Sequence, residues 1–196
     1  MKKKEKTYQQ ILEATFILFA EFGIQGTSLA MIAEKVGISK PSIYYHFPSK
    51  DALIETVFKV IFADYRFDNY FQIDKMTAKN FEKKLYSGGI SMIPEANEEN
   101  FIVMKVLNEF ILTAGREHNY AGEIVELQKD FLLGFERCMD KGVELGVVDA
   151  KDSKAKSQLL ALTIDNISNY MLMGIQVEYR KIWKLAITNI MERVDK

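Results

Sequence analysis

Residues 27–53 read TSLAMIAEKVGISKPSIYYHFPSKDAL, and this stretch decides the fold. Its first part predicts a short helix over 28–36, because Thr27 or Ser28 can cap a helix by accepting a hydrogen bond from an unpaired backbone N–H. The buried side of this helix is predicted to consist of three apolar residues at helical spacing: Leu29, Ile32 and Val36. Gly37 follows, and glycine readily adopts the left-handed conformation that ends a helix.

The second part of the stretch predicts another short helix over 40–46. Ile38 is expected to fill the corner between the two helices, and Ser39 is expected to cap the second one. Pro41 stands in its first turn, where a missing backbone N–H leaves no hydrogen bond unmade. Two short helices joined by a glycine turn in this way form a helix-turn-helix.

The predicted helix over 40–46 has an unusual surface for a core element. Ile43 and Phe47 are suited to burial. The other side chains are polar or amphipathic: Lys40, Ser42, Tyr44, Tyr45 and His46. In a helix-turn-helix the second helix enters the DNA major groove with its N-terminal residues facing the bases. We therefore expect the bases to be contacted by Lys40, Pro41 and Ser42. We expect the flanking phosphates to be contacted by hydroxyl, imidazole and ammonium groups, which belong to Tyr44, Tyr45, His46 and Lys50.

These aromatic residues also have an ordinary interpretation. Two adjacent tyrosines on an arbitrary helix are commonly half-buried core residues, and a lone histidine is commonly a surface residue. The surrounding helix-turn-helix favours the DNA interpretation, and a catalytic role for His46 would need a partner and a pocket that no nearby residues indicate.

Outside this stretch the chain is dominated by helical periodicity, and alternating strand patterns are scarce. We therefore expect an all-α protein of about nine helices. The predicted helices cover residues 7–22, 28–36, 40–46, 50–69, 77–86, 98–114, 121–145, 153–176 and 178–194. Gly23 ends the first of them, Ser49 can cap the fourth, and the last two form the halves of a helical hairpin.

The charge of the chain is divided unevenly along its length. The net charge is −1, but residues 1–50 contain seven lysines and four glutamates, which leaves 19 basic and 23 acidic residues in the rest. This division predicts a small module that meets a polyanion, joined to a body that does not. The lysines at positions 2–4 fit either a solvated terminus or contact with phosphates.

The helix-turn-helix stretch resembles the DNA-binding domain of the tetracycline-repressor (TetR) family. The resemblance covers residues 1–55 and rests on three runs: Gly-Ile-Ser at 37–39, Ser-Ile-Tyr-Tyr-His-Phe at 42–47 and Ser-Lys-Asp-Ala-Leu at 49–53. It implies phosphate contacts from Thr27, Tyr44, Tyr45, His46 and Lys50. It implies base reading from Ser39, Lys40, Pro41 and Ser42. The chain departs from the family at Ala30 and Met31, where many members have charged residues, and at Pro41, which is often glycine.

The resemblance also implies two domains. Residues 1–50 would form the helix-turn-helix DNA-binding domain, and residues 51–196 would form a helical ligand-binding and dimerisation domain. The last two helices of each subunit would pack into a four-helix bundle, which makes the protein a homodimer.

Aromatic and methionine residues of the body can line an apolar ligand cavity or belong to ordinary core. The ligand contacts that we expect are Phe62, Tyr65, Phe101, Met104, Phe131, Phe135 and Asn169. Further candidates are Phe110, Tyr120 and Met171. Asp165, Asn166 and Asn169 stand inside an apolar stretch, where they can orient a ligand, fix the register of a dimer, or face water.

These features predict a bacterial transcriptional repressor that binds double-stranded DNA as a dimer and is released by a small-molecule effector. The two DNA-binding domains of a dimer enter successive major grooves when they lie about 34–36 Å apart. The operator is therefore expected to be a pseudo-palindrome. The alternatives are a constitutive DNA-binding protein without a ligand, and a small helical enzyme. We expect no enzyme, because the sequence has no Glu-x-x-His pair, phosphate-binding glycine loop or nucleophile elbow.

The composition predicts a folded cytoplasmic protein. Hydrophobic residues make up 48% of the 196 residues, which is enough for a sizeable core. The apolar runs stop well short of the roughly 20 residues that span a bilayer, and no signal peptide is recognised. Cys138 is the single cysteine, which is typical of a reducing compartment. No cofactor is expected, since Cys138 and His118 are isolated from other metal-ligating residues.

Overall fold

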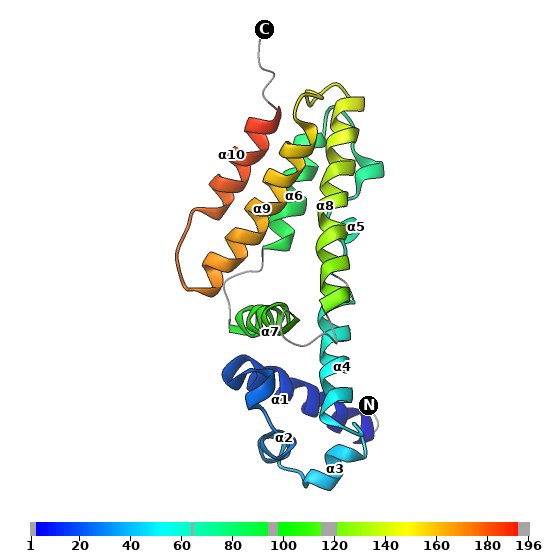
Figure 1. Ribbon diagram of the computed structural model, residues 1–196, viewed down its shortest axis with the longest axis vertical. Coiled ribbons are helices and arrows are strands. Elements are labelled where there is room, and N and C mark those ends of the chain that lie inside the picture. Colours follow the sequence, from blue (N-terminus) through cyan, green and yellow to red (C-terminus); the bar gives the residue numbers. More distant parts are fainter. Residues whose placement is uncertain (1–2, 64, 94–97, 115–120, 192–196) are drawn as a thin grey trace. The chain divides into compact units, whose positions relative to one another are not determined.

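The computed structural model in Figure 1 describes residues 3–63, 65–93, 98–114 and 121–191. The regular elements in this part of the chain are all helices, so the predicted all-α fold is confirmed. The chain divides into two compact units, residues 1–64 with 96–122 and residues 65–95 with 123–196. This division reflects packing, and the predicted division of roles at residue 50 remains a prediction. None of the helices in the described residues is both long and apolar enough to span a membrane.

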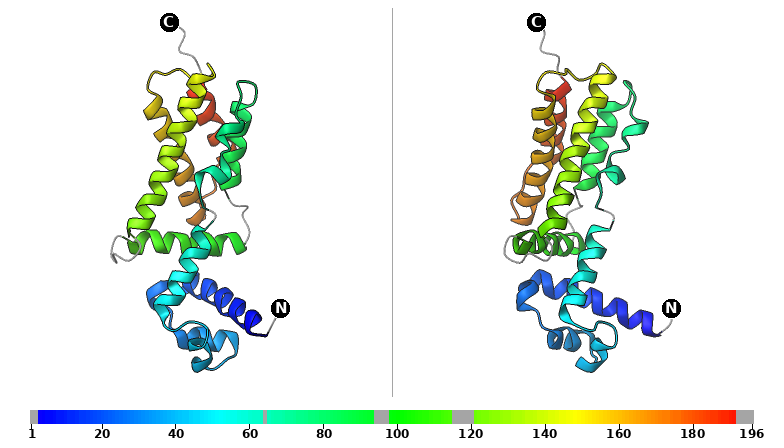
Figure 2. Two further views of the ribbon diagram at one scale, coloured as in Figure 1. Left: turned by 90° about the vertical axis from the view of Figure 1, so that its right-hand side faces the viewer. Right: turned by 45° about the vertical axis from the view of Figure 1, so that its right-hand side comes forward.

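The first unit is formed by α1 (Lys3–Gly26), α2 (Leu29–Val36), α3 (Lys40–Tyr44), α4 (Lys50–Phe62) and α7 (Glu98–Ala114). α1 packs against α2, α4 and α7, and α7 lies across α1 (Figure 2). Its core contains apolar side chains from each helix: Ile11, Phe19, Ile32, Ile43, Leu53, Val57 and Phe110. The predicted end of the first helix takes the form of a break, because Gly23 has a φ of 73° inside α1.

The second unit is formed by α5 (Phe67–Tyr70), the 3-10 turn η1 (Ile73–Lys75), α6 (Phe81–Met92), α8 (Ala121–Glu144), α9 (Ser153–Leu172) and α10 (Tyr179–Met191). α9 and α10 lie side by side, and α10 also packs on α6 (Figures 1 and 2). The core is rich in fully buried aromatic residues: Phe67, Phe71, Phe81, Phe135 and Trp183. The indole N–H of Trp183 donates to the Tyr86 carbonyl oxygen at 3.0 Å, which satisfies its one polar atom.

The predicted helix over 50–69 is wrong beyond Phe62. The backbone is extended at Arg66 (φ −127°, ψ 140°), and α5 begins after it as a separate helix. The backbone N–H of Phe67 donates to the Asp130 carboxylate at 3.1 Å, and the Phe67 ring is fully buried. The burial of this ring and the contact with α8 therefore outweigh the local helical pattern.

The predicted helix over 77–86 begins too early. The Asn80 side chain accepts a hydrogen bond from the Thr77 backbone N–H at 2.8 Å and donates to the Lys75 carbonyl oxygen at 3.2 Å. An asparagine that bonds the neighbouring backbone in this way stabilises a turn in place of a helix. α6 therefore starts only after Asn80.

The predicted helix over 77–86 also ends too early, because α6 continues to Met92 through Gly88 and Gly89, and both glycines are buried. A Cβ added to Gly89 would lie 2.2 Å from the Trp183 ring, and one added to Gly88 would lie 2.4 Å from the Phe71 ring. These glycines let large rings pack directly against the helix backbone. The predicted hairpin of the last two helices is confirmed, with α9 ending earlier because Gly174 has a φ of 71°.

We expect Gly134 of α8 to tolerate no side chain, because an added Cβ would lie 2.1 Å from the Phe67 ring. Overpacking of a core typically costs about 1–3 kcal/mol, and Gly134→Ala should lower the free energy of unfolding by about that amount. Gly122→Ala in the same helix is the control, since no atom of the described residues lies within 4 Å of its added Cβ. Urea denaturation compares the two variants, and equal stabilities would contradict this packing argument.

Candidate nucleic-acid interface

α2 and the turn after it have the predicted caps. The Ser28 hydroxyl accepts a hydrogen bond from the Met31 backbone N–H at 3.2 Å, so Ser28 is the residue that caps α2. Gly37 has a φ of 75° and its N–H donates to the Glu34 carbonyl oxygen at 3.1 Å. This left-handed residue ends α2 and turns the chain toward α3, as predicted.

Ser39 precedes α3, but the predicted side-chain cap is wrong. Its hydroxyl lies 2.8 Å from the Ser42 hydroxyl and makes no capping bond to the backbone. A capping side chain accepts from the second or third N–H of a helix. Here the second residue is Pro41, which has no N–H, and the Ser42 N–H donates to the Ser39 carbonyl oxygen at 2.9 Å. Both hydroxyls therefore lie together at the start of α3.

α3 has one buried side and one exposed side. Ile43 is fully buried and Phe47 is 3% exposed, whereas the Tyr44 and Tyr45 side chains are 47% and 69% exposed. Phe47, three residues after the end of α3, stacks on Tyr8 of α1 with 5.0 Å between ring centroids and ties this segment to the first unit. The predicted contact residues at its start, Lys40 and Pro41, are exposed, and Ser42 is half-buried.

His46, just after the end of α3, lies near the rings of Tyr8 and Tyr45. Its ring centroid is 6.4 Å from that of Tyr8 and 5.3 Å from that of Tyr45. Its Nδ1 is buried and has no hydrogen-bond partner among the described residues. A buried N–H without an acceptor is costly, so the favoured tautomer has its hydrogen on Nε2. His46 can thus offer one N–H donor to an outside group.

Two lysines lie beside this surface. The Lys50 ammonium, at the start of α4, donates to the Gln25 carbonyl oxygen at 3.3 Å. The Lys4 ammonium lies 4.8 Å from the centroid of the Tyr45 ring, which is a cation–π distance. From the sequence, Lys4 fits either a solvated terminus or a contact with phosphate. The sequence does not decide between these roles, because the position of Lys4 relative to Tyr45 depends on how α1 packs. Lys4 therefore joins the candidate surface.

Thr27 does not belong to this surface. Its side chain is 1% exposed, and its hydroxyl lies 2.8 Å from the carbonyl oxygen of Gly23 and 3.1 Å from that of Leu18. The hydroxyl therefore bonds inside the protein. This geometry corrects the expectation, implied by the resemblance, that Thr27 contacts a phosphate.

The predicted ligand residues are divided between the two units. Phe62, Phe101 and Met104 belong to the first unit, and Tyr65, Phe131, Phe135 and Asn169 belong to the second. Phe62 packs on Phe58 with 4.4 Å between ring centroids. Phe101 is half-buried, and Met104 is buried. Tyr120 and His118 lie outside the described residues.

In the second unit, Tyr65 and Phe131 belong to one aromatic cluster together with Tyr70. The Tyr65 ring centroid is 4.8 Å from that of Phe131 and 5.9 Å from that of Tyr70. Phe135 is buried in the core of this unit at 1% exposure, and its contact with a ligand remains a prediction. Asn169 is exposed on α9, and its contact with a ligand remains a prediction.

Burial raises the pKa of Tyr65, Asp165 and Cys138 in the second unit. The nearby Asp165 carboxylate raises the pKa of Tyr65 further. Burial raises the pKa of the Cys138 thiol to about 12, so this free cysteine stays a thiol at neutral pH. A thiol in this form is a poor nucleophile and metal ligand.

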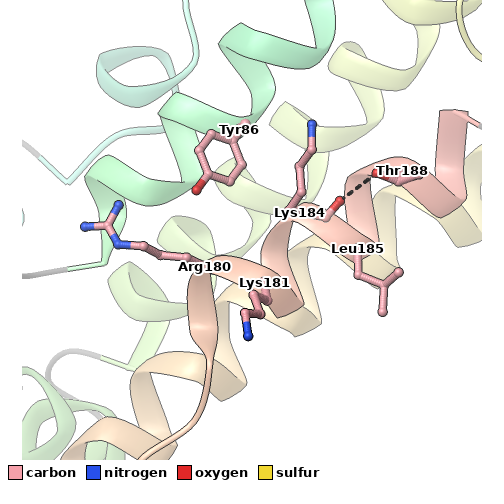
Figure 3. Close-up of a pocket in the computed structure, with 6 residues that line it drawn as sticks. All are labelled: Tyr86, Arg180, Lys181, Lys184, Leu185 and Thr188. Carbon is pink, nitrogen blue, oxygen red and sulfur yellow. Dashed lines mark hydrogen bonds between the residues drawn. The ribbon is translucent and has the colours of Figure 1, made fainter.

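A surface pocket of about 380 Å³ lies between α6 and α10 and is lined by Tyr86, Arg180, Lys181, Lys184, Leu185 and Thr188 (Figure 3). Arg180 extends toward the Tyr86 hydroxyl, but the ammonium groups of Lys181 and Lys184 point in opposite directions (Figure 3). Lys181 is paired with Glu178 and Lys184 with Glu82. The three cations therefore do not converge on one ligand position, and none of the predicted ligand residues lines this pocket.

Comparison with known proteins places these features in context. Residues 11–57 match the model of a family described as bacterial regulatory proteins, tetR family. The chain is 47% identical over 51 residues to the HTH-type transcriptional regulator RutR of Escherichia coli K12. The aligned segment covers 26% of this chain and 24% of RutR. The match thus spans about a quarter of the length of this relative. The fatty acid metabolism regulator protein of Bacillus subtilis is 24% identical over 181 residues, covering 90% of this chain and 89% of that protein.

Solved structures share the fold. A TetR transcription regulator from Haloarcula marismortui superposes with a TM-score of 0.71 at 16% identity, covering 95% of this chain and 97% of that one. The complex of SmeT with triclosan superposes with a TM-score of 0.69 at 16% identity, covering 96% and 93%. SmeT is described as the repressor of a multidrug efflux pump of Stenotrophomonas maltophilia.

The two serines before α3 and α4 allow a test of the local geometry. The Ser49 hydroxyl accepts the Ala52 N–H at 3.0 Å, whereas Ser39 makes no such bond. Losing a capping side chain typically costs about 1 kcal/mol, so Ser49→Ala should lower the free energy of unfolding by about that amount. Ser39→Ala should change it much less. Chemical denaturation measures both, and a larger loss for Ser39→Ala would refute the assignment of the caps.

Proposed function

The chain belongs, through residues 11–57, to the tetR family of bacterial regulatory proteins, and on this premise we propose that it is a ligand-responsive DNA-binding repressor of transcription. The observation that carries the proposal is the two-sided character of α3. Ile43 of α3 and Phe47 just after it are buried while Tyr44 and Tyr45 are exposed, which is the arrangement that a DNA-reading helix needs. The protein acts in the cytoplasm, where its operator lies.

The exposed side of α3 divides the work of DNA binding between its two ends. Lys40, Pro41 and Ser42 at the start of the helix face the bases in the major groove, together with the Ser39 hydroxyl. Tyr44, Tyr45, His46 and Lys50 contact the flanking phosphates, which fix the register of the protein on the duplex. The Nε2–H of His46 is a suitable donor to a phosphate oxygen, because Nδ1 is buried.

A homodimer formed through α9 and α10 is supported by the exposed apolar side chains of this hairpin. The exposed apolar residues are Leu159, Leu162, Tyr170, Met173, Ile175, Ile182 and Leu185. Some of them line a shallow groove of about 440 Å³ between the two helices. A contiguous apolar surface of this kind marks a protein interface, and a two-fold interface buries the same surface on both subunits. The dimer presents two copies of α3 to a pseudo-palindromic operator.

The effector is a small molecule with substantial apolar surface. The aromatic cluster of the buried Phe131 with the partly buried Tyr65 and Tyr70 supplies suitable contacts. The name of the Bacillus subtilis relative and the triclosan bound to SmeT support this class of ligand. The ligand lowers operator affinity by favouring a spacing of the two α3 helices that does not match successive major grooves. A preference of about 2.7 kcal/mol for that state reduces operator binding about a hundredfold.

The division of DNA contacts can be tested with two lysine variants and the duplex upstream of the protein's own gene. We expect Lys50→Ala to weaken binding to every duplex and to reduce the salt slope by roughly one unit, since it removes a phosphate contact. Lys40→Ala should mainly relax the preference for the operator over random DNA. Fluorescence anisotropy at several salt concentrations measures both effects. Lys59→Ala, on the same helix as Lys50, is the charge-matched control.

Equal effects of Lys40→Ala and Lys50→Ala on every sequence would contradict the division of contacts. A wild-type chain that binds no duplex at low salt would contradict the proposed function itself.

The dimer can be tested at Leu185, which is 60% exposed on α10. Leu185→Glu places a charge in the proposed interface, where burial without a partner is strongly unfavourable. We expect the mass in solution to fall from twice 22.6 kDa to 22.6 kDa, and operator binding to weaken with it. Leu133→Glu on α8, at a site that is 55% exposed, should leave the dimer intact. Light scattering after gel filtration checks both, and an unchanged Leu185→Glu dimer would place the interface elsewhere.

A further inference from the structure

The break in α1 leaves a backbone donor that the helix itself cannot satisfy. Gly23 has φ 73° and ψ 167°, so the regular helical hydrogen bonds are interrupted at this residue. The next turn closes separately, with the Thr27 N–H donating to the Gly23 carbonyl oxygen at 3.2 Å. The N–H of Ile24 therefore stands at the start of a new turn, where it needs an acceptor from elsewhere.

Glu109 of α7 supplies that acceptor. The Ile24 N–H donates to Oε1 of the Glu109 carboxylate at 3.2 Å, across 85 positions of sequence. The same oxygen would lie only 2.8 Å from a Cβ added to Gly23, so the carboxylate sits directly against the backbone of the break. Glycine at position 23 thus allows both the left-handed φ and the approach of the carboxylate. α7 is fastened to α1 at this turn.

The turn over residues 23–27 leads directly into the DNA-binding elements of the same unit. Thr27 anchors it through its buried hydroxyl, and Ser28 then caps α2. The Lys50 ammonium, at the start of α4, donates to the Gln25 carbonyl oxygen of this turn at 3.3 Å. A shift of the turn would therefore move both the start of α2 and a proposed phosphate contact.

We propose that Glu109 is a positioning residue for DNA binding, which holds the turn over 23–27 and through it sets the places of α2 and Lys50. The inference rests on the proposed function and deepens it. Glu109 itself contacts no DNA in this scheme. Removal of an acidic side chain from a DNA-binding protein ordinarily strengthens DNA binding by reducing repulsion. Removal of the Glu109 carboxylate is expected to weaken DNA binding, which distinguishes positioning from simple repulsion.

The test compares Glu109→Ala with Glu109→Gln in full-length protein, with operator affinity measured by anisotropy well below the unfolding temperature. We expect Glu109→Ala to weaken operator binding about tenfold, since a hydrogen bond to a charged group is lost from the turn. Glu109→Gln keeps an acceptor oxygen and should restore the affinity to within about twofold of wild type. In Glu109→Ala the salt slope should fall by no more than about one unit, since Lys50 is the proposed phosphate contact that the turn positions, and in Glu109→Gln it should keep its wild-type value.

Glu13→Ala is the charge-matched control, since Glu13 is an exposed carboxylate on α1. It should bind the operator as well as wild type or more tightly. Hydrogen exchange gives an independent readout, because the Ile24 amide should exchange faster in Glu109→Ala and not in Glu13→Ala. Should Glu109→Ala fail to fold, Glu109→Asp, with a side chain too short to reach the turn, is expected to show the same loss of affinity.

The outcomes separate the inference from the function on which it rests. Glu109→Ala that binds the operator like wild type overturns the positioning role and leaves the repressor proposal standing. Glu109→Gln that binds as weakly as Glu109→Ala overturns it too, since the acceptor would then be irrelevant. Wild-type protein that binds no DNA overturns the proposed function and the inference together.

Discussion

The burial of Ile43 and Phe47 is the constraint on which the candidate interface depends. α3 has five residues, and a helix this short is not stable by itself in water. It is held by packing these two side chains into the first unit, with Phe47 stacked on Tyr8. With Ile43 and Phe47 anchored inside, the Tyr44 and Tyr45 side chains remain exposed at the end of α3. The polar surface of α3 therefore exists because its apolar side is fixed.

The first unit fixes this helix at both of its ends. Gly37 ends α2 with a left-handed residue, and Ser49 caps α4 after α3. The break at Gly23 adds a junction at which α7, α1 and the start of α4 meet, through the Glu109 carboxylate and the Lys50 ammonium. Charged groups that bond backbone atoms make stronger hydrogen bonds than neutral groups do, so this junction is well suited to hold the turn in one place.

The second unit shows how one helix serves two requirements. α9 buries Leu160 and Ile164 against its core, while Leu162 and Tyr170 remain exposed on the other side. A helix that is apolar on both sides within one chain is expected where a second chain covers the exposed side. The aromatic core explains why the predicted ligand residues were hard to separate from ordinary packing. Phe131 and Phe135 are both phenylalanines, and they lie one helical turn apart on the same side of α8. Only the side chains that surround each ring can show whether it contacts a ligand or belongs to the core.

The sequence by itself determined the helix-turn-helix, the Ser49 cap and the turn at Gly37, because each depends on residues a few positions apart. It left the cap of α2 open between Thr27 and Ser28, and the structure shows that Ser28 makes the capping bond. Tertiary structure alone decided the burial of Thr27, the place of Lys4 beside Tyr45, and the contact between Glu109 and Ile24. These contacts join residues that periodicity does not relate. Helical patterns report which residues share a face, but the partner of that face is chosen by packing over the whole unit.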